Sequence, residues 1–247
     1  MIIGGIIQAR MGSTRFPEKI LKKLNGKTVL EHIIKRVEDS GVDMCIVATT
    51  KNDKDDAVQG LCREHNVICF RGSEDDVLER FYYAAKENDI DVIVRITADD
   101  PLKDSGIIKK AITLLVDGEY DYVSNTMQPT YPEGIDVEVF TFNALEKAYY
   151  EAKLPSEHEH VTPYIWKNRD KFNTYNFIHD TDLSYMRWTM DTEDDYRFME
   201  NIYSNFVGRD NFSMDEVLKY IEQNPDVQKI NEGHVRNEGY LKSIKED

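Results

Sequence analysis

The 247-residue sequence has few cysteines and no long apolar run. Its three cysteines, Cys45, Cys62 and Cys69, form no CxxC pair, and Cys45 and Cys69 lie in apolar runs typical of buried strands. Neither a disulfide framework nor a zinc site is expected. No run reaches the roughly 18 apolar residues of a membrane span, and the N-terminal MIIGGIIQAR has no basic residues before its short apolar segment. We therefore expect a cytoplasmic protein without a signal peptide.

Positive charge is also scarce. Lysine and arginine number 31 against 46 aspartates and glutamates, so the formal net charge is −15 at pH 7. A nucleic-acid binder needs clustered cations to neutralise phosphates, so neither nucleic acid nor membrane is an expected partner. Residues 8–23 reverse this sign with one acid and five cations, which are Arg10, Arg15, Lys19, Lys22 and Lys23. A basic segment in an acidic protein indicates a small anionic ligand that is held locally.

The first half of the sequence alternates short apolar runs with amphipathic stretches. Strands are expected at residues 2–7, 44–50, 67–70, 91–97 and 121–125, and helices at 28–40, 53–66, 75–88 and 105–116. Continuous apolar strands between helices predict a three-layer α/β/α domain whose mixed, mainly parallel sheet is covered on both faces. Ligands bind such sheets beyond the carboxyl ends of the strands.

The regular alternation of expected strands and helices ends after Asn125. A turn-rich stretch precedes a half-exposed strand expected at residues 136–142. Further helices are expected at 144–152, 157–168, 193–206 and 214–223, and further strands at 174–178 and 186–190. We interpret residues 125–180 as a lobe added to a single domain of residues 1–247. The tail after Pro225 is polar and is expected to be loosely held.

Two motifs at expected strand ends suit a nucleotide. In QARMGSTRFPEK, residues 8–19, Gly12, Ser13 and Thr14 can offer N–H groups and hydroxyls to phosphate oxygens beside the cations of the segment. The motif is neither a P-loop nor GxGxxG, and a solvated basic turn is the alternative. In TADDPL, residues 97–102, Asp99 or Asp100 suits Mg²⁺, although DDP is also an ordinary turn and helix cap.

A third motif, DTEDD, occupies residues 191–195. Thr192 followed by acids is a good helix start, which favours a capping and helix-dipole role for Asp194 and Asp195. The HEH of residues 158–160 could be a metal cluster, but no third ligand of fitting spacing is evident. GxSxG is absent, which argues against a Ser/His/Asp hydrolase.

The segment IIQARMGSTRFPEKIL resembles the signature of the cytidylyltransferases that activate acidic sugars, such as the CMP-sialic acid and CMP-Kdo synthetases. The closest resemblance is to the SpsF-like branch, named for spore coat polysaccharide biosynthesis. It continues through FRGSEDDVLERF, VRITADDPL, YPEGIDVEVF, EHVTPYI and WTMDTEDD, and so covers residues 2–200. The resemblance implies a nucleotide-diphospho-sugar transferase-like (Rossmann-like) fold. It also implies Mg²⁺-dependent transfer of CMP from CTP to a sugar or acidic sugar, with release of pyrophosphate, for a surface polysaccharide or glycan.

The resemblance also implies site residues. Catalytic roles fall to Arg10, Lys19, Asp99 and Asp191, and Asp99 and Asp191 are the metal ligands. Each of these two aspartates follows an expected strand, at residues 91–97 and 186–190, so parallel neighbouring strands should bring both carboxylates to the same edge of the sheet. The residues expected to contact the nucleotide are Gln8, Ala9, Arg10, Gly12, Ser13, Arg15, Lys19, Thr49, Arg71, Ser73, Asp76, Ala98 and Asp99. Ala98 stands where many relatives have glycine. Asp76 and Arg80 are also spaced to pair with each other on a helix. Acceptor contacts are expected from Glu133, Asp136, Glu138 and His160.

Relatives form dimers through the region that corresponds to residues 125–180. This region is rich in aromatics, including Tyr131, Tyr164, Trp166 and Phe172, and exposed aromatics would need a partner, so we expect a homodimer. Two alternatives to CMP-sugar synthesis stay open. One is transfer to a phosphorylated sugar or polyol, and the other is a catalytically silent nucleotide-binding scaffold. Retention of Asp99 and Asp191 beside the basic segment argues against the silent alternative.

Overall fold

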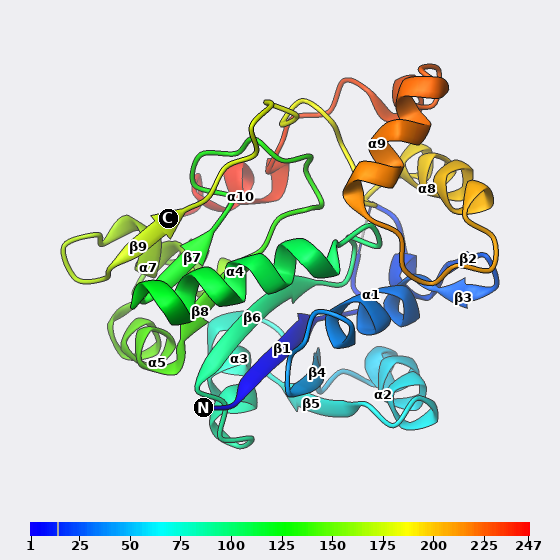
Figure 1. Ribbon diagram of the computed structural model, residues 1–247. Coiled ribbons are helices and arrows are strands. Elements are labelled where there is room, and N and C mark those ends of the chain that lie inside the picture. Colours follow the sequence, from blue (N-terminus) through cyan, green and yellow to red (C-terminus); the bar gives the residue numbers. More distant parts are fainter. Residues whose placement is uncertain (14) are drawn as a thin grey trace.

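The computed structural model describes residues 1–13 and 15–247. Thr14, one of the expected phosphate contacts, lies outside them. A seven-stranded sheet in the order β5-β4-β1-β6-β8-β7-β9 forms the centre of the molecule (Figure 1). β8 is antiparallel to both of its neighbours, and the other pairings are parallel. The predicted mixed, mainly parallel sheet is confirmed.

The elements follow the expected order along the chain. The strands are β1 (Ile3–Gln8), β2 (Lys23–Leu24), β3 (Lys27–Thr28), β4 (Met44–Thr50), β5 (Ile68–Gly72), β6 (Val92–Thr97), β7 (Tyr122–Ser124), β8 (Glu138–Thr141) and β9 (Thr174–Asn176). The α-helices are α1 (Val29–Glu38), α2 (Asp56–Glu64), α3 (Val77–Lys86), α4 (Ser105–Gly118), α5 (Phe142–Glu151), α6 (Pro155–His160), α7 (Pro163–Lys167), α8 (Glu193–Asn205), α9 (Met214–Gln223) and α10 (Glu238–Ser243). Short 3₁₀ helices are η1 (Lys19–Leu21), η2 (Asp53–Asp55) and η3 (Gln228–Asn231).

Two hydrophobic cores, one on each face of the sheet, hold the three layers together. Successive strand residues point to opposite faces, so Ile7 of β1 and Val47 of β4 join the core under α1, α2 and α4, whereas Ile6 and Ile46 join the core under α3, α5 and α7. Strands buried on both faces explain the continuous apolar runs in the sequence.

Residues 125–180, which we interpreted as a lobe added to the domain, are closely joined to the sheet. They contribute β8 and β9 to the sheet, and α5 and α7 pack in the core that also includes α3. The half-exposed strand expected at residues 136–142 is a buried strand, because β8 lies between β6 and β7. The helix expected at residues 157–168 is two short helices, α6 and α7, which are separated at Val161 by a left-handed φ of 70°.

The strand expected at residues 186–190 is wrong. This segment makes only an isolated parallel bridge between Arg187 and Glu133, and it belongs to no strand of the sheet. The sequence analysis also missed the hairpin of β2 and β3. Its turn is an Asn-Gly pair in which Asn25 and Gly26 both have positive φ, the usual signature of a tight hairpin.

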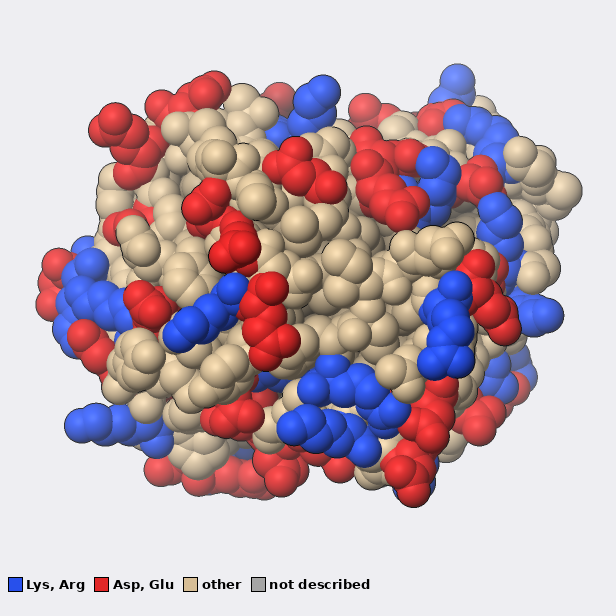
Figure 2. Space-filling model, turned by 90° about the horizontal axis from the view of Figure 1, so that it is seen from below, with Lys and Arg blue, Asp and Glu red and all other residues tan. Residues whose placement is uncertain are grey.

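On the face shown in Figure 2, acidic side chains are interspersed among lysines and arginines. Over residues 1–13 and 15–247, no helix is long and apolar enough to cross a lipid bilayer.

Candidate active site

A cavity of about 620 Å³ opens at the carboxyl ends of β1 and β6, and its size suits a small-molecule ligand. Because these strands are parallel neighbours, the loops that follow Gln8 and Thr97 begin side by side. The expected site residues that line the cavity are Gln8, Arg10, Gly12, Ser13, Arg15, Lys19, Ala98, Asp99, Glu133, Asp136, Glu138, His160 and Asp191. Ala9 is buried within the loop, and its N–H donates to the Ala48 carbonyl at 3.1 Å.

Asp99 and Asp191 converge on one cation. The ammonium of Lys19 lies 2.6 Å from Oδ2 of Asp99 and 2.7 Å from Oδ1 of Asp191. Two oxygens that contact the same nitrogen lie well within the roughly 10 Å that ligands of one magnesium site allow. The Lys19 side chain is 11% exposed, so the ammonium is largely shielded from water between the two acids.

This arrangement shifts the pKa values of Lys19 and Asp99. Burial alone would lower the pKa of Lys19, but the two carboxylates outweigh burial and raise it. Burial also opposes ionisation of Asp99, yet the adjacent Lys19 lowers the pKa of this carboxyl to about 2. Both groups are charged at neutral pH, so Asp99 is a carboxylate ready to contact a cation.

Backbone hydrogen bonds, rather than a neighbouring parallel strand, bring Asp191 to this position. The Met190 N–H donates to the Asp99 carbonyl at 2.9 Å. Behind Asp191, the buried Asp195 carboxylate accepts from the Asp191 N–H at 2.9 Å and pairs with Arg187 at 2.8 Å. Asp195 also completes a capping box with Thr192 at the start of α8, as the helix-start interpretation predicted.

The loop after β1 is anchored through its backbone and keeps its cations at the cavity. The Met11 N–H donates to the buried carboxylate of Asp55 at 2.7 Å, which ties the loop to η2. Arg10 is exposed at the rim, and Arg15 Nη2 contacts Oδ2 of Asp191 at 3.0 Å. Three cations from residues 10–19 therefore face the two acids across the same opening.

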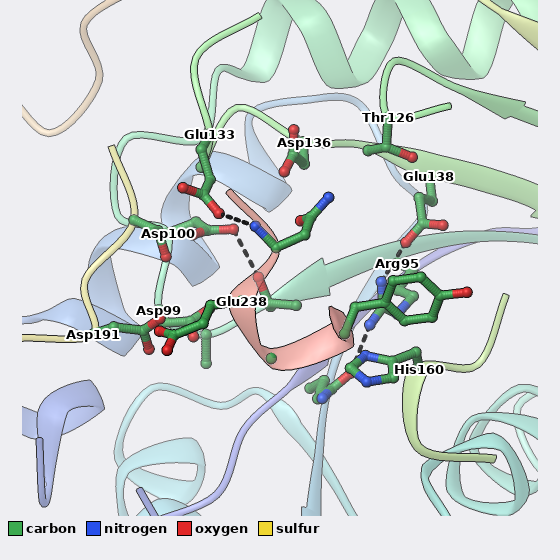
Figure 3. Close-up of a pocket in the computed structure, with 18 of the residues that line it drawn as sticks. Arg95, Asp99, Asp100, Thr126, Glu133, Asp136, Glu138, His160, Asp191 and Glu238 are labelled. Atoms are coloured by element: carbon green, nitrogen blue, oxygen red, sulfur yellow. Dashed lines mark hydrogen bonds and ion pairs between the residues drawn. The ribbon is translucent and has the colours of Figure 1, made fainter. Parts of the chain in front are cut away.

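The opposite end of the cavity is lined by carboxylates with cationic partners. Glu138 of β8 stands opposite Arg95 of β6 in the strand register, and their side chains form an ion pair that is 13% exposed at Arg95 and 9% exposed at Glu138. Glu133 pairs with Arg187 at 3.1 Å. Figure 3 shows Glu133, Asp136 and Glu138 directed toward the space that also receives Arg95 and His160.

Burial shifts the pKa values of ionisable side chains at this end of the cavity. It raises the pKa values of Glu133 and Asp136, although nearby arginines oppose the change, and it lowers the pKa of His160. Asp100, the alternative metal ligand, is buried and pairs with Lys103 at 2.9 Å instead of joining Asp99.

Gly134 explains how Glu133 and Asp136 reach the cavity. Its φ is 103°, and a Cβ at this position would lie 2.3 Å from the carbonyl oxygen of Trp188. Only glycine permits this close backbone approach. The Trp188 N–H also donates to the Glu133 carbonyl at 2.7 Å, which holds the two backbone segments together. The YPEG motif therefore joins Glu133 and Asp136, two residues expected to contact the acceptor, to the segment that carries Asp191.

Four residues expected beside the nucleoside do not line this cavity. Thr49 is fully buried, and Arg71 donates to the Thr50 and Asn52 carbonyls and pairs with Asp56. Ser73 and Asp76 have local roles, because Ser73 Oγ accepts from the Asp76 N–H and Asp76 Oδ1 caps α3. The family resemblance implied these positions, and their contact with the nucleotide stays a prediction.

The other side-chain alternatives are also resolved. Asp76 does not pair with Arg80. Its Oδ2 contacts Nδ1 of His158 at 2.8 Å, whereas Arg80 Nη1 donates to the Ser73 carbonyl. His160 contacts Oγ of Ser243 at 2.9 Å, so the HEH histidines face different partners. Among the described residues, no group of three or more His, Cys, Asp or Glu side chains could hold a metal ion.

The sequence analysis missed several cations and the chain terminus. Arg95, Lys103, Arg169 and Arg187 line the cavity, and so do residues 237–240 of the tail that we expected to be loosely held. Arg80 is a further cation, buried beneath this loop region, and burial together with the nearby Arg10 lowers its pKa to about 10. Arg95 lies in the apolar strand β6 and Arg187 lies in an irregular segment. Neither sequence context indicates a functional cation.

The aromatics expected to need a partner are mostly buried in this chain. Tyr131 is 3% exposed, Tyr164 is 7% exposed and Phe172 is 5% exposed, and Trp166 is half-buried. The argument for a dimer from exposed aromatics is therefore wrong for these residues.

Comparison with known proteins agrees with this geometry. The cytidylyltransferase family profile matches residues 4–230. This chain belongs to the cytidylyltransferase family. It is 40% identical over 243 residues to an uncharacterised protein of Methanocaldococcus jannaschii, which covers 97% of this chain and 98% of that protein. It is 32% identical over 232 residues to the spore coat polysaccharide biosynthesis protein SpsF of Bacillus subtilis, with 90% and 94% covered.

The fold comparison gives the same family. A cytidylyltransferase structure from Leptospira borgpetersenii superposes with a TM-score of 0.90 at 35% identity, covering 95% of this chain and 100% of that one. The expected Rossmann-like nucleotidyltransferase fold and the resemblance to the SpsF-like cytidylyltransferases are therefore confirmed.

Proposed function

We propose that this chain transfers CMP from CTP to a hydroxyl of a sugar or sugar acid and releases pyrophosphate. The observation that carries the proposal is the convergence of Asp99, Asp191 and Lys19 at the carboxyl ends of β1 and β6, beside Arg10 and Arg15. Carboxylates for a metal and cations for a triphosphate are the two requirements of nucleotidyl transfer, and here they share one opening. Membership of the cytidylyltransferase family supports cytosine as the base.

In this proposal Arg10, Arg15 and Lys19 hold the phosphates, and the backbone of Gly12 and Ser13 completes the cradle. An acceptor oxygen forms a bond to the α-phosphorus while the bond from that phosphorus to the pyrophosphate oxygen breaks. Cations that face the departing pyrophosphate stabilise the charge that develops on it.

Asp99 and Asp191 are the residues that would hold Mg²⁺. The donor set fits, because Mg²⁺ takes one or two carboxylates and completes its shell with phosphate oxygens and water. The bound ion would supply charge neutralisation at the phosphates. Lys19 neutralises this carboxylate pair, which explains how the two acids stay close together.

The acceptor hydroxyl must lose a proton. Glu133 and Asp136 line the cavity, and burial raises their pKa values, which brings a carboxylate closer to the basicity that suits a general base. We assign proton uptake to this pair of acids. His160 and Glu138 line the same end and are proposed to contact acceptor hydroxyls.

The charge of the acceptor end favours an acceptor with at most one anionic group. Arg95, Lys103 and Arg187 are each neutralised by a carboxylate. Arg169 is an exposed cation of the lining that has no carboxylate partner within residues 1–13 and 15–247. One uncommitted cation suits a single carboxylate better than a phosphate monoester.

A pyrophosphate-release assay with CTP, ATP, GTP and UTP, each with neutral sugars, sugar acids and sugar phosphates, tests the function. We expect acceptor-dependent release with CTP and a sugar or sugar acid. Release only with a phosphorylated acceptor would select the alternative acceptor class. No release with any pair, together with intact nucleotide binding, would select a silent scaffold. The Asp191→Asn variant serves as the inactive control.

We also retain the homodimer as a proposal, now without the argument from exposed aromatics. Light scattering tests it directly, and the expected mass is twice the chain mass of 28.7 kDa. A single species at the chain mass at micromolar concentration would contradict it.

A further inference from the structure

One segment that follows α9 lies across the cavity. After η3, residues 236–243 return to the site, and Asn237, Glu238, Gly239 and Tyr240 line it. We call residues 236–243 the C-terminal cap. In Figure 3 the ribbon of this segment passes between Asp99 and Asp191 on one side and Arg95 and His160 on the other. The cap therefore stands between the proposed triphosphate and acceptor ends.

Ion pairs and hydrogen bonds hold the acceptor side of the cap. The Arg236 guanidinium pairs with the Asp136 carboxylate, and the Asn237 N–H donates to Oε1 of Glu133 at 2.8 Å. Both acids are the ones assigned above to the acceptor. The cap thus occupies hydrogen-bonding groups that an acceptor would need.

The packing of the cap is weak. No residue of α10 is buried, and its contacts are polar or edge-on. The ring of Tyr240 meets His160 at a centroid distance of 5.2 Å and Trp166 at 5.9 Å, and Oγ of Ser243 contacts His160 at 2.9 Å and donates to Glu159 at 2.7 Å. A six-residue helix is too short to be stable alone. Segments with little buried apolar surface and exposed polar contacts open at low free energy. The cap is therefore a part of the fold that a local electrostatic change can release.

One contact links the cap to the proposed triphosphate site. Oε2 of Glu238 lies 2.8 Å from Nη1 of Arg15, and both side chains are 42% exposed. Oε1 of Glu238 also pairs with Lys242 of the same helix at 2.7 Å. Arg15 also contacts Asp191 through its other terminal nitrogen. An anionic triphosphate at Arg15 would attract the guanidinium and repel the Glu238 carboxylate. An exposed ion pair of this kind is too weak to resist such competition.

We propose that the C-terminal cap is a nucleotide-responsive cover of the acceptor side, and that the triphosphate releases it by taking Arg15 from Glu238. This inference rests on the proposed function, because it needs the triphosphate at residues 10–19. Release of the cap frees Glu133 and Asp136 for the acceptor once the nucleotide is in place.

The test compares the wild-type chain with Glu238→Gln and Glu246→Gln. Glu246 is exposed in the same C-terminal region and forms no ion pair within the described residues, so its variant has the same change in net charge. The probes are inorganic tripolyphosphate and CTP, each with Mg²⁺. Calorimetry gives the affinity, and amide hydrogen exchange reports the opening of residues 236–243.

Both probes should increase exchange in the cap of the wild-type chain. Glu238→Gln should show the increased exchange without a probe and bind each probe about two- to fivefold more tightly, whereas Glu246→Gln should match the wild type. Bound probe with unchanged or stronger protection of the cap would overturn the proposal. So would equal probe affinities of the two variants.

The two probes separate this inference from the proposed function. If tripolyphosphate opens the cap but CTP binds no better than ATP, the proposal for the cap is supported and the proposed transfer of CMP from CTP is contradicted. If CTP binds and reacts while the cap stays closed, the proposed function is supported and the proposal for the cap is contradicted. If neither probe binds, the phosphate site at residues 10–19 is wrong, and the cap proposal falls with it.

Discussion

The two ends of the cavity are built in different ways. The end that we propose for the nucleotide comes from residues 8–13 and 15–19 and from two acids that contact Lys19, and the other end is the one that we propose for the acceptor. The acceptor end comes from β6, β8, the YPEG turn, residue 187 and the C-terminal cap. Its acids pair with cations of the chain. At the nucleotide end Arg15 and Lys19 also pair with acids, whereas Arg10 is exposed.

The difference shows which end is prepared for a charged ligand. A triphosphate meets cations whose backbone is already anchored, as at Met11 and Asp55. An acceptor meets Glu133 and Asp136 already bonded to the cap. We therefore expect substitutions at the nucleotide end to reduce turnover most. Substitutions at the acceptor end should instead affect stability or acceptor binding.

The largest effect is expected at the carboxylate pair. Asp99→Asn or Asp191→Asn keeps the shape but removes a charge from the metal site, and should lower kcat by at least about a hundredfold. Because both acids act on one site, the double variant should be little worse than the worse single one. Pyrophosphate release measures this, with Asp194→Asn as a control that removes an exposed acid from the same helix start. Full activity of Asp191→Asn would contradict the shared site.

Glu138→Gln should mainly destabilise the fold. It leaves the buried Arg95 without its carboxylate, and loss of one partner of a buried pair costs about 3 kcal/mol in the free energy of unfolding. Denaturant unfolding measures this, with Glu159→Gln as a control at an exposed carboxylate of the same cavity.

The effect of Glu138→Gln should also depend on pH. Burial opposes ionisation, but Arg95, Thr162 and Tyr122 lower the pKa of Glu138 below its ordinary value of about 4.3. The stabilisation is therefore present above that value and is lost as the pH falls through the folded pKa. A stability difference between wild type and variant that stays constant from about pH 7 to about pH 3 would argue against this ion pair.

Lys19→Ala should lower kcat or raise the KM for CTP by at least about tenfold, which is roughly 1.4 kcal/mol. It removes a phosphate contact and leaves Asp99 facing Asp191 without a cation between them. Lys22→Ala is the matched control, because Lys22 is a neighbouring exposed cation outside the cavity lining. Equal kinetics of the two variants would move the phosphate site elsewhere.

Arg169→Ala should give the smallest effect and sharpen the contrast between the two ends. A single exposed cation is expected to change acceptor KM by about three- to tenfold and leave the KM for CTP unchanged. Arg197→Ala removes another exposed arginine, outside the cavity lining, and should change neither constant. A larger change in the KM for CTP than in the KM for the acceptor would contradict the placement of Arg169 at the acceptor end of the cavity.

The sequence was sufficient for most of the sheet and for the nucleotide end. Apolar runs such as residues 44–50 coincide with β4, because a strand buried on both faces leaves a continuous pattern. The convergence of Asp99 and Asp191 was also predicted, but its assumed cause was wrong. The backbone bond from Met190 to the Asp99 carbonyl brings the acids together, and a single bond of this kind has no sequence signature.

At the acceptor end, only the acids and His160 were predicted from the sequence. Their cationic partners lie far away in sequence, with Arg95 separated by 43 positions from Glu138 and Arg236 by 100 positions from Asp136. No periodicity links residues at such separations. The tail was expected to be loosely held because it is polar, yet polar contacts place it across the cavity. Thr49, Arg71, Ser73 and Asp76, which the family resemblance implied, lie outside the lining of the cavity, because a matching motif does not fix the direction of a side chain.

A crystal structure of the chain with CTP and Mg²⁺ tests the central claim most directly. The account predicts the triphosphate at Arg10, Arg15 and Lys19, with the metal held by Asp99 and Asp191. Phosphates bound at another strand end, or a metal that contacts neither aspartate, would contradict it.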